Sequence, residues 1–300
     1  MIMHFRCIGP IGPIGPINPI GPSLPIPHSS FPRCIIRPRY FSLNPDGAFP
    51  VSLIKVLLFG IVEGLTEFLP VSSTGHMIVI ERWLTLGGSP GFAETFMIVI
   101  QLPAILAVVL YFRARLFPFY PGADTPAVLR LWFKIAVAFL PAAVLGLLFD
   151  DLIEAWFFNP LSVSVALIIG GAVLLLLERP GRAPRYERVA DIGFGIALVI
   201  GLFQCLAMMP GTSRSAATII GAMVLGASRP AAAEFSFFLA VPTMLGATVF
   251  KTLKSGLDLS AGEWLLIGAG GLASFITAYL VVAAFMHYIQ RRDFKPFGYY

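Results

Sequence analysis

Long runs of apolar residues, separated by short polar loops, dominate the chain after about residue 50. The runs cover 51–68, 92–112, 132–149, 161–178, 192–209, 211–227, 233–250 and 262–286. Most of them approach the roughly 20 residues that an α-helix needs to cross the hydrocarbon core of a bilayer. The pattern predicts an all-α polytopic membrane protein.

Two polar stretches resemble each other, and each interrupts a hydrophobic helix that then resumes as a second apolar helix. The first stretch reads Glu63-Gly-Leu-Thr-Glu67-Phe-Leu-Pro70-Val-Ser-Ser73-Thr-Gly-His76, and the second reads Gln204-Cys-Leu-Ala-Met-Met-Pro210-Gly-Thr-Ser213-Arg214-Ser215-Ala-Ala-Thr218. A helix is expected to break at each proline, because the ring removes a backbone hydrogen bond and clashes with the preceding turn. Ionisable side chains are costly at membrane depth unless they are paired or line a polar cavity. Two such stretches therefore predict a functional site.

An offset of 140 residues brings both stretches into register. The matched pairs are Pro70 with Pro210, Ser73 with Ser213, and Glu94 with Glu234. This agreement predicts an internal duplication, with repeat one at about 51–178 and repeat two at about 192–300. By the same count the second repeat lacks its last helix, because the chain ends at Tyr300 where another crossing should begin.

The charged loops favour an inverted topology with two re-entrant helical hairpins, at 51–87 and 192–227. Each hairpin would enter the membrane, break at Pro70 or Pro210, and return to the same side. The remaining crossings then place most basic loops on one side and the acidic loop at 150–154 on the other, which follows the positive-inside rule. Hairpins that enter from opposite faces would bring their tips together near the midplane, where freed backbone groups can line a cavity.

Composition supports the membrane assignment, since 57% of the residues are hydrophobic and only 12% are charged. The net charge of +5 does not indicate nucleic-acid binding, because the basic residues lie in short loops between apolar runs. The three cysteines have no metal-ligand spacing. Residues 1–50 form a Gly/Pro-rich low-complexity extension, which predicts disorder or a start site placed too far upstream, so that 51–300 is the single membrane domain.

Glu63 and Glu67 are four residues apart and share one helix face just before the first break. Two carboxylates in this arrangement could hold Mg²⁺ or Ca²⁺, or one could act as a general base. The alternative is a structural role as hydrogen-bond partners between helices.

Ser72, Ser73 and Thr74 lie where the second helix of the hairpin is expected to begin. Free N–H groups and the helix dipole favour an anion there, although the hydroxyls could simply cap the helix. His76 could activate a serine nucleophile or protonate a leaving group, and its alternative is a structural histidine.

Ser213, Arg214 and Ser215, with Thr218 one turn later, form a second candidate anion site. The guanidinium of Arg214 matches phosphate oxygens in geometry, and hydroxyl donors flank it. Arg214 could alternatively reach the membrane interface or pair with Glu63 or Glu67. Taken together, the two stretches predict hydrolysis of a phosphate ester or anhydride on a lipid carrier.

The motifs Glu63 to His76 and Pro210-Gly-Thr-Ser-Arg-Ser215 resemble the two signatures of the undecaprenyl-diphosphate phosphatase family, the bacitracin-resistance membrane phosphatases. The similarity runs from about Ser52 to Phe297. It implies hydrolysis of undecaprenyl diphosphate to the monophosphate, a Mg²⁺ or Ca²⁺ requirement, a bacterial plasma-membrane location with a site facing outward, and a homodimer.

By the same resemblance, each candidate residue takes a role from the family. Glu63 and Glu67 match the catalytic or metal-associated acids, Ser73 the proposed nucleophile, and His76 the proposed acid/base. Ser213, Arg214 and Thr218 match the diphosphate-binding residues.

The main alternative is a secondary transporter or lipid-carrier flippase without hydrolytic activity, since inverted repeats with broken helices are transporter architecture. A nucleophile and an acid beside Arg214 argue for hydrolysis, because transport needs neither. The type-2 phosphatidic-acid phosphatases also carry Ser-Gly-His and Ser-Arg fragments, but they require a His-x₃-Asp pair after Ser-Arg. Here the next histidine is His287 and the residue four positions later is Arg291, which excludes that class.

Overall fold

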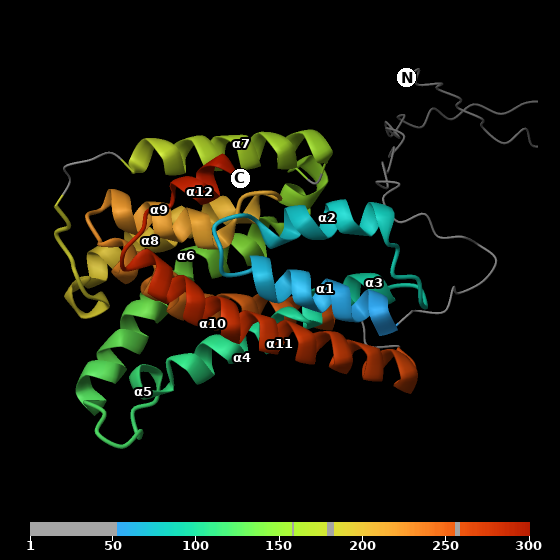
Figure 1. The fold of residues 1–300 in the computed structure, drawn as a ribbon, viewed down its shortest axis with the longest axis horizontal. Helices are drawn as coiled ribbons and strands as arrows, with labels where there is room; N and C mark the ends of the chain where they lie inside the picture. The colour runs from blue at the N-terminus through green and yellow to red at the C-terminus, as the bar shows by residue number, and fades with distance from the viewer. Residues whose placement is uncertain (1–52, 158, 179–182, 256–258) are drawn as a thin grey trace, which may run out of the picture. The chain divides into compact units, whose positions relative to one another are not determined.

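The computed structural model describes residues 53–157, 159–178, 183–255 and 259–300, and these residues are helical apart from loops and one isolated β-bridge. The α-helices are α1 (Leu53–Thr66), α2 (Ser73–Trp83), α3 (Phe92–Val99), α4 (Gln101–Tyr111), α5 (Arg113–Leu116), α6 (Thr125–Phe157), α7 (Pro160–Leu177), α8 (Phe194–Gln204), α9 (Arg214–Val224), α10 (Arg229–Ser255), α11 (Ala261–Ile289) and α12 (Lys295–Tyr299) (Figure 1). Within the described ranges, five segments are long and apolar enough to cross a membrane. This confirms the prediction of an all-α polytopic membrane protein. The predicted N-terminal extension lies outside the described residues.

The four helices next to the polar breaks are too short to cross a bilayer. Helix α1 has 14 residues, and α2, α8 and α9 have 11 each. At about 1.5 Å per residue, each falls well short of the roughly 30 Å hydrocarbon core. Their length therefore fits hairpins that turn back.

Hydrogen bonds at the open ends show that both hairpins return to where they start. Lys55 Nζ, at the beginning of α1, donates to the carbonyl of Thr85 just past α2 at 2.7 Å. In the second hairpin, the Arg185 amide, before α8, donates to the carbonyl of Gly226 just past α9 at 2.7 Å. The two hairpin folds predicted at 51–87 and 192–227 are therefore confirmed.

The hairpins open at opposite ends of α11. The loop after α2 contacts the beginning of α11, where the Ser89 amide donates to Glu263 at 2.8 Å. The loop after α9 leads to Arg229, which pairs with Glu178, and Glu178 also accepts the amide of Phe294 beyond the end of α11 at 3.0 Å. The repeats are thus inverted with respect to each other, as predicted.

Close packing of α1 against α11 fixes the position of the first break (Figure 1). Glycines make the contact possible: a Cβ on Gly60 would lie 2.1 Å from the carbonyl oxygen of Gly270, and one on Gly64 would lie 2.4 Å from that of Ser274. The two backbones touch directly, so α1 is held in register along α11 and carries Glu63 and Glu67 to a defined depth.

The apolar run at 92–112 is divided into two helices at Ile100. Pro103 lies in the first turn of α4 and has no N–H to donate to the preceding turn. By contrast, Pro141 and Pro242 lie inside α6 and α10, and both helices continue past them.

Candidate anion site at the tips of the two hairpins

The first break positions Ser72 and Ser73 at the start of α2. Ser72 is the N-cap, and its Oγ accepts the amide of Gly75 at 3.3 Å, as the capping alternative predicted. Its φ of 65° is positive, which is uncommon outside glycine and marks a conformation that the surrounding structure must hold. Ser73 is the first residue of the helix, and Thr74 is exposed beside it.

The second break places Ser213 and Arg214 in the equivalent position. Helix α8 ends in a 3₁₀ turn, and the chain reverses at Gly211 with φ of 93°. A Cβ at Gly211 would also lie 2.6 Å from the carbonyl oxygen of Val163 in α7. Glycine is therefore required both by the positive φ and by this close contact. Ser213 caps α9 and accepts the amide of Ala216 at 3.2 Å.

The two tips meet. Ser215 is fully buried, and its Oγ donates to the carbonyl of Leu69 in the first break at 2.8 Å. It lies 2.9 Å from Ser213 Oγ, which leaves Ser213 as the donor in that pair because Ser215 has a single proton. Ser215 thus joins the two hairpins, and Ser213 bonds to Ser215.

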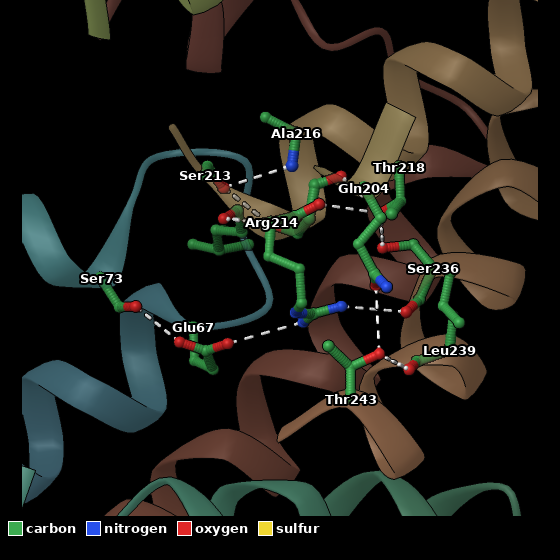
Figure 2. A network of polar contacts seen from close by, with 12 residues as sticks. Glu67, Ser73, Gln204, Ser213, Arg214, Ala216, Thr218, Ser236, Leu239 and Thr243 are labelled. Atoms are coloured by element: carbon green, nitrogen blue, oxygen red, sulfur yellow. Dashed lines mark hydrogen bonds and ion pairs between the residues drawn. The ribbon is translucent and has the colours of Figure 1, made fainter. Parts of the chain in front are cut away.

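Glu67 joins the candidate nucleophile to the candidate phosphate-binding residue (Figure 2). Ser73 Oγ donates to Glu67 Oε2 at 2.5 Å, and Arg214 Nη2 lies 3.5 Å from Glu67 Oε1. The alternative in which Arg214 pairs with Glu67 is therefore confirmed. One carboxylate holds groups from both repeats.

Arg214 keeps part of its guanidinium free for a ligand. Nη1 donates to the carbonyl of Ser236 in α10 at 3.0 Å. Nε and Nη2 are buried and make no hydrogen bond to any residue that the structure describes, although Nη2 remains in ion-pair range of Glu67. Buried donors without partners are rare in native proteins, and an oxyanion would satisfy both.

Glu63 lies one turn before Glu67 and is only 2% exposed. Its Oε1 has no hydrogen-bond partner among the described residues. In the described ranges, no three His, Cys, Asp or Glu side chains lie close enough together to form a metal centre. Two carboxylates nevertheless suit Mg²⁺, which keeps several waters and binds through one or two carboxylates plus substrate phosphate. Glu63 is the better placed ligand, because both oxygens of Glu67 already have partners.

His76 lies on α2 but bonds elsewhere than to Ser73. Nδ1 is 2.8 Å from the carbonyl of Ser72, and Nε2 is 2.8 Å from the hydroxyl of Tyr300. A carbonyl only accepts, so Nδ1 carries a proton, and in the neutral imidazole Nε2 accepts the tyrosine O–H. The structure therefore gives Ser73 a carboxylate partner, Glu67, and gives His76 a tyrosine partner.

A pocket of about 740 Å³ opens beside the hairpin tips. The polar side chains that line it include His76, Thr212 and Ser213, and most of the lining is apolar, from α2, α7 and α9 together with Phe297 and Tyr300 of the C-terminal segment. Such a lining, mostly apolar with a few polar groups, suits a ligand with an anionic head and an apolar chain.

Four residues around this site were given no role from the sequence: Gln204, Ser236, Thr243 and Tyr300. Gln204 is 2% exposed and its Oε1 lies 3.2 Å from Thr243 Oγ1, while the hydroxyl of Ser236 contacts Thr218 Oγ1 at 2.6 Å (Figure 2). Gln204, Ser236 and Thr243 are polar residues inside otherwise apolar runs, and this feature of the sequence could have identified them.

The fold and the site together define a multi-pass membrane protein with a candidate anion site between two inverted, broken-helix hairpins. The model of the family described as bacitracin resistance protein BacA matches residues 56–300. The chain therefore belongs to the bacitracin resistance protein BacA family.

Curated relatives agree with this assignment over most of their length. The chain is 47% identical over 253 residues to undecaprenyl-diphosphatase 1 of Clostridioides difficile (strain 630), covering 83% of this chain and 92% of the relative. It is 46% identical to an undecaprenyl-diphosphatase of Enterococcus faecalis, covering 83% and 93%, and 48% identical to that of Fusobacterium nucleatum, covering 82% and 95%.

Proposed function

We propose that this protein is a membrane-embedded phosphatase that hydrolyses undecaprenyl diphosphate to undecaprenyl phosphate and inorganic phosphate. Relatives above 45% identity carry the name undecaprenyl-diphosphatase. The observation that supports this most directly is the Glu67 carboxylate, which holds Ser73 and Arg214 at once. A base, a nucleophile and an anion clamp in contact are what hydrolysis requires and what transport does not, so the flippase alternative is not favoured.

In the proposed reaction, Ser73 Oγ attacks the terminal phosphorus while Glu67 takes its proton. The bond from that phosphorus to the bridging oxygen breaks, and undecaprenyl phosphate leaves. Water then releases phosphate from Ser73 and restores the hydroxyl. Arg214 Nε and Nη2 donate to the non-bridging oxygens, where negative charge must be stabilised. A water activated by Glu67 is the alternative nucleophile.

A divalent cation, Mg²⁺ or Ca²⁺, completes the proposal. Glu63, with its unpartnered buried oxygen, and Glu67 would hold the ion. When bound, it would neutralise charge on the diphosphate.

The apolar pocket would receive the isoprenoid chain from the bilayer, with the diphosphate directed toward Ser213 and Arg214. Access from the outer face of a bacterial plasma membrane and assembly as a homodimer belong to the same proposal. The basic loops support that orientation: Arg115 pairs with Glu234, and Lys134 Nζ donates to the carbonyl of Ala190 at 2.8 Å, so these loops gather at one end.

The test is phosphate release from undecaprenyl diphosphate by the purified protein in detergent, with Mg²⁺, Ca²⁺ or a chelator. Metal-dependent release by the wild type, lost in Ser73→Ala, is expected. Radiolabelled terminal phosphate should appear on Ser73 in a rapidly quenched reaction. Release that persists in Ser73→Ala but not in Glu67→Gln would instead establish water as the nucleophile. No release by folded protein that still binds the lipid would overturn the phosphatase assignment in favour of the flippase.

A further inference from the structure

The guanidinium of Arg214 is fixed by a closed ring of hydrogen bonds that runs through α10. Thr218 Oγ1 lies 2.9 Å from the carbonyl of Arg214, one turn before it, and 3.2 Å from that of Ser215. It also lies 2.6 Å from Ser236 Oγ. The carbonyl of Ser236 in turn accepts Arg214 Nη1 at 3.0 Å, which closes the ring (Figure 2).

Proton counting sets the direction of the bonds. A hydroxyl has one proton, and the two carbonyls beside Thr218 can only accept, so the proton of Thr218 is directed to them. Ser236 must then donate to Thr218 Oγ1. Both side chains are fully buried, and no water competes for these bonds without entering the packed α9–α10 contact.

We infer that Ser236 is a positioning residue for Arg214, acting through Thr218 and through its own carbonyl. The inference rests on the proposed function. An arginine side chain has several rotatable bonds, and fixing it before the substrate arrives lowers the entropy lost on binding and in the transition state. The ring fixes the end of the side chain at Nη1 and leaves Nε and Nη2 free for the phosphate.

The experiment measures kcat/KM for undecaprenyl diphosphate with the full chain in detergent. Ser236→Ala and Thr218→Val should each lower kcat/KM about tenfold, the effect of one buried hydrogen bond. The double variant should lose no more than either single variant, because both break the same ring. Thr218→Ser, which keeps the hydroxyl, should recover most of the kcat/KM that Thr218→Val loses.

Two controls separate positioning from loss of stability. Ser274→Ala removes an equally buried serine hydroxyl that has no partner among the described residues, and it should leave kcat/KM and the unfolding temperature unchanged. In an Arg214→Lys background, which lacks the forked guanidinium, Ser236→Ala should cause no further loss. Losses that multiply in the double variant, or an equal loss in the Arg214→Lys background, would overturn the inference.

Binding of undecaprenyl diphosphate, measured by thermal shift on the same variants, keeps the two hypotheses distinguishable. Wild-type protein that binds without hydrolysis would refute the phosphatase, and a weaker affinity in Ser236→Ala would still support the ring. Unchanged affinity and unchanged kcat/KM in Ser236→Ala would refute the inference alone. Wild-type protein that neither binds nor hydrolyses would refute both.

Discussion

At the scale of single residues, the site depends on how few partners Arg214 has. Only Nη1 is committed to a hydrogen bond within the described residues, and the side chain is 11% exposed. A buried cation in this state is costly to the fold unless a second charge compensates it, and Glu67 supplies that charge at 3.5 Å. The cost is consistent with a site that is completed by an anionic substrate.

Replacing Arg214 should therefore remove more than one contact to the phosphate. Arg214→Gln is expected to lower kcat/KM by about 10²–10³-fold, the range found when an oxyanion donor is removed. The measurement is initial rates of phosphate release. Arg188→Gln is a matched control, because Arg188 is exposed and, among the residues that the structure describes, pairs with nearby Asp191. A comparable loss in that variant would contradict a specific role for Arg214.

The hydroxyl of Tyr300 provides a second prediction at this scale. Tyr300→Phe keeps the ring stacked on His76, at 8° and 5.7 Å between centroids, but removes the donor to Nε2. If His76 acts as the acid or base, freeing Nε2 should change the pH profile of kcat while leaving the unfolding temperature within about 1 °C. An unchanged profile would leave His76 with a structural role.

At the scale of elements, the contact between α1 and α11 decides where Glu63 and Glu67 lie. Gly64 has no room for a side chain, since a Cβ would meet the Ser274 carbonyl oxygen at 2.4 Å and the Ala278 nitrogen at 2.8 Å. Backbone atoms cannot rotate away, so a larger residue must push the helices apart.

Gly64→Ala should accordingly destabilise the protein by about 1–3 kcal/mol, the usual range for overpacking, and lower activity through displacement of the carboxylates. The loss of stability is measured by thermal unfolding in detergent. Gly268→Ala, in the partner helix α11 and with nothing within 4 Å of the new Cβ, should be neutral or slightly stabilising. Equal unfolding temperatures for the two variants would contradict the packing argument.

At the scale of the whole molecule, the pocket links the hairpin tips to α7 and the C-terminal segment. A Cβ at Gly170 would stand in open space although the residue lines the pocket, so a large side chain there narrows the pocket without a backbone clash. Gly146 in α6 is equally open and lies away from it.

Gly170→Phe should raise KM for undecaprenyl diphosphate severalfold. The increase should be smaller with a short isoprenyl diphosphate, because only the long isoprenoid chain would extend along the whole pocket. Gly146→Phe should leave both KM values near wild type. The measurement is KM from steady-state kinetics with the two substrates. Equal increases in KM for both substrates would mean that the isoprenoid chain does not bind in this pocket.

The sequence alone determined the helical membrane fold, the two breaks at Pro70 and Pro210 and the duplication. The length of an apolar run, the effect of a proline and the similarity between two segments are properties of the sequence itself. They can therefore be recognised without knowledge of tertiary contacts. The two motifs likewise supplied Glu67, Ser73 and Arg214 as candidates.

Only the tertiary structure decided which of these groups touch. In the folded molecule Ser73 bonds to Glu67, and His76 bonds to Tyr300, which is 224 residues away in sequence. The tertiary structure also brought Ser236 of α10 into contact with Thr218 of α9, and no role in the site was predicted for this serine from the sequence. The physical reason is that hydrogen-bond partners across helices depend on crossing points and registers, which close contacts such as that of Gly64 with Ser274 fix only in the folded molecule.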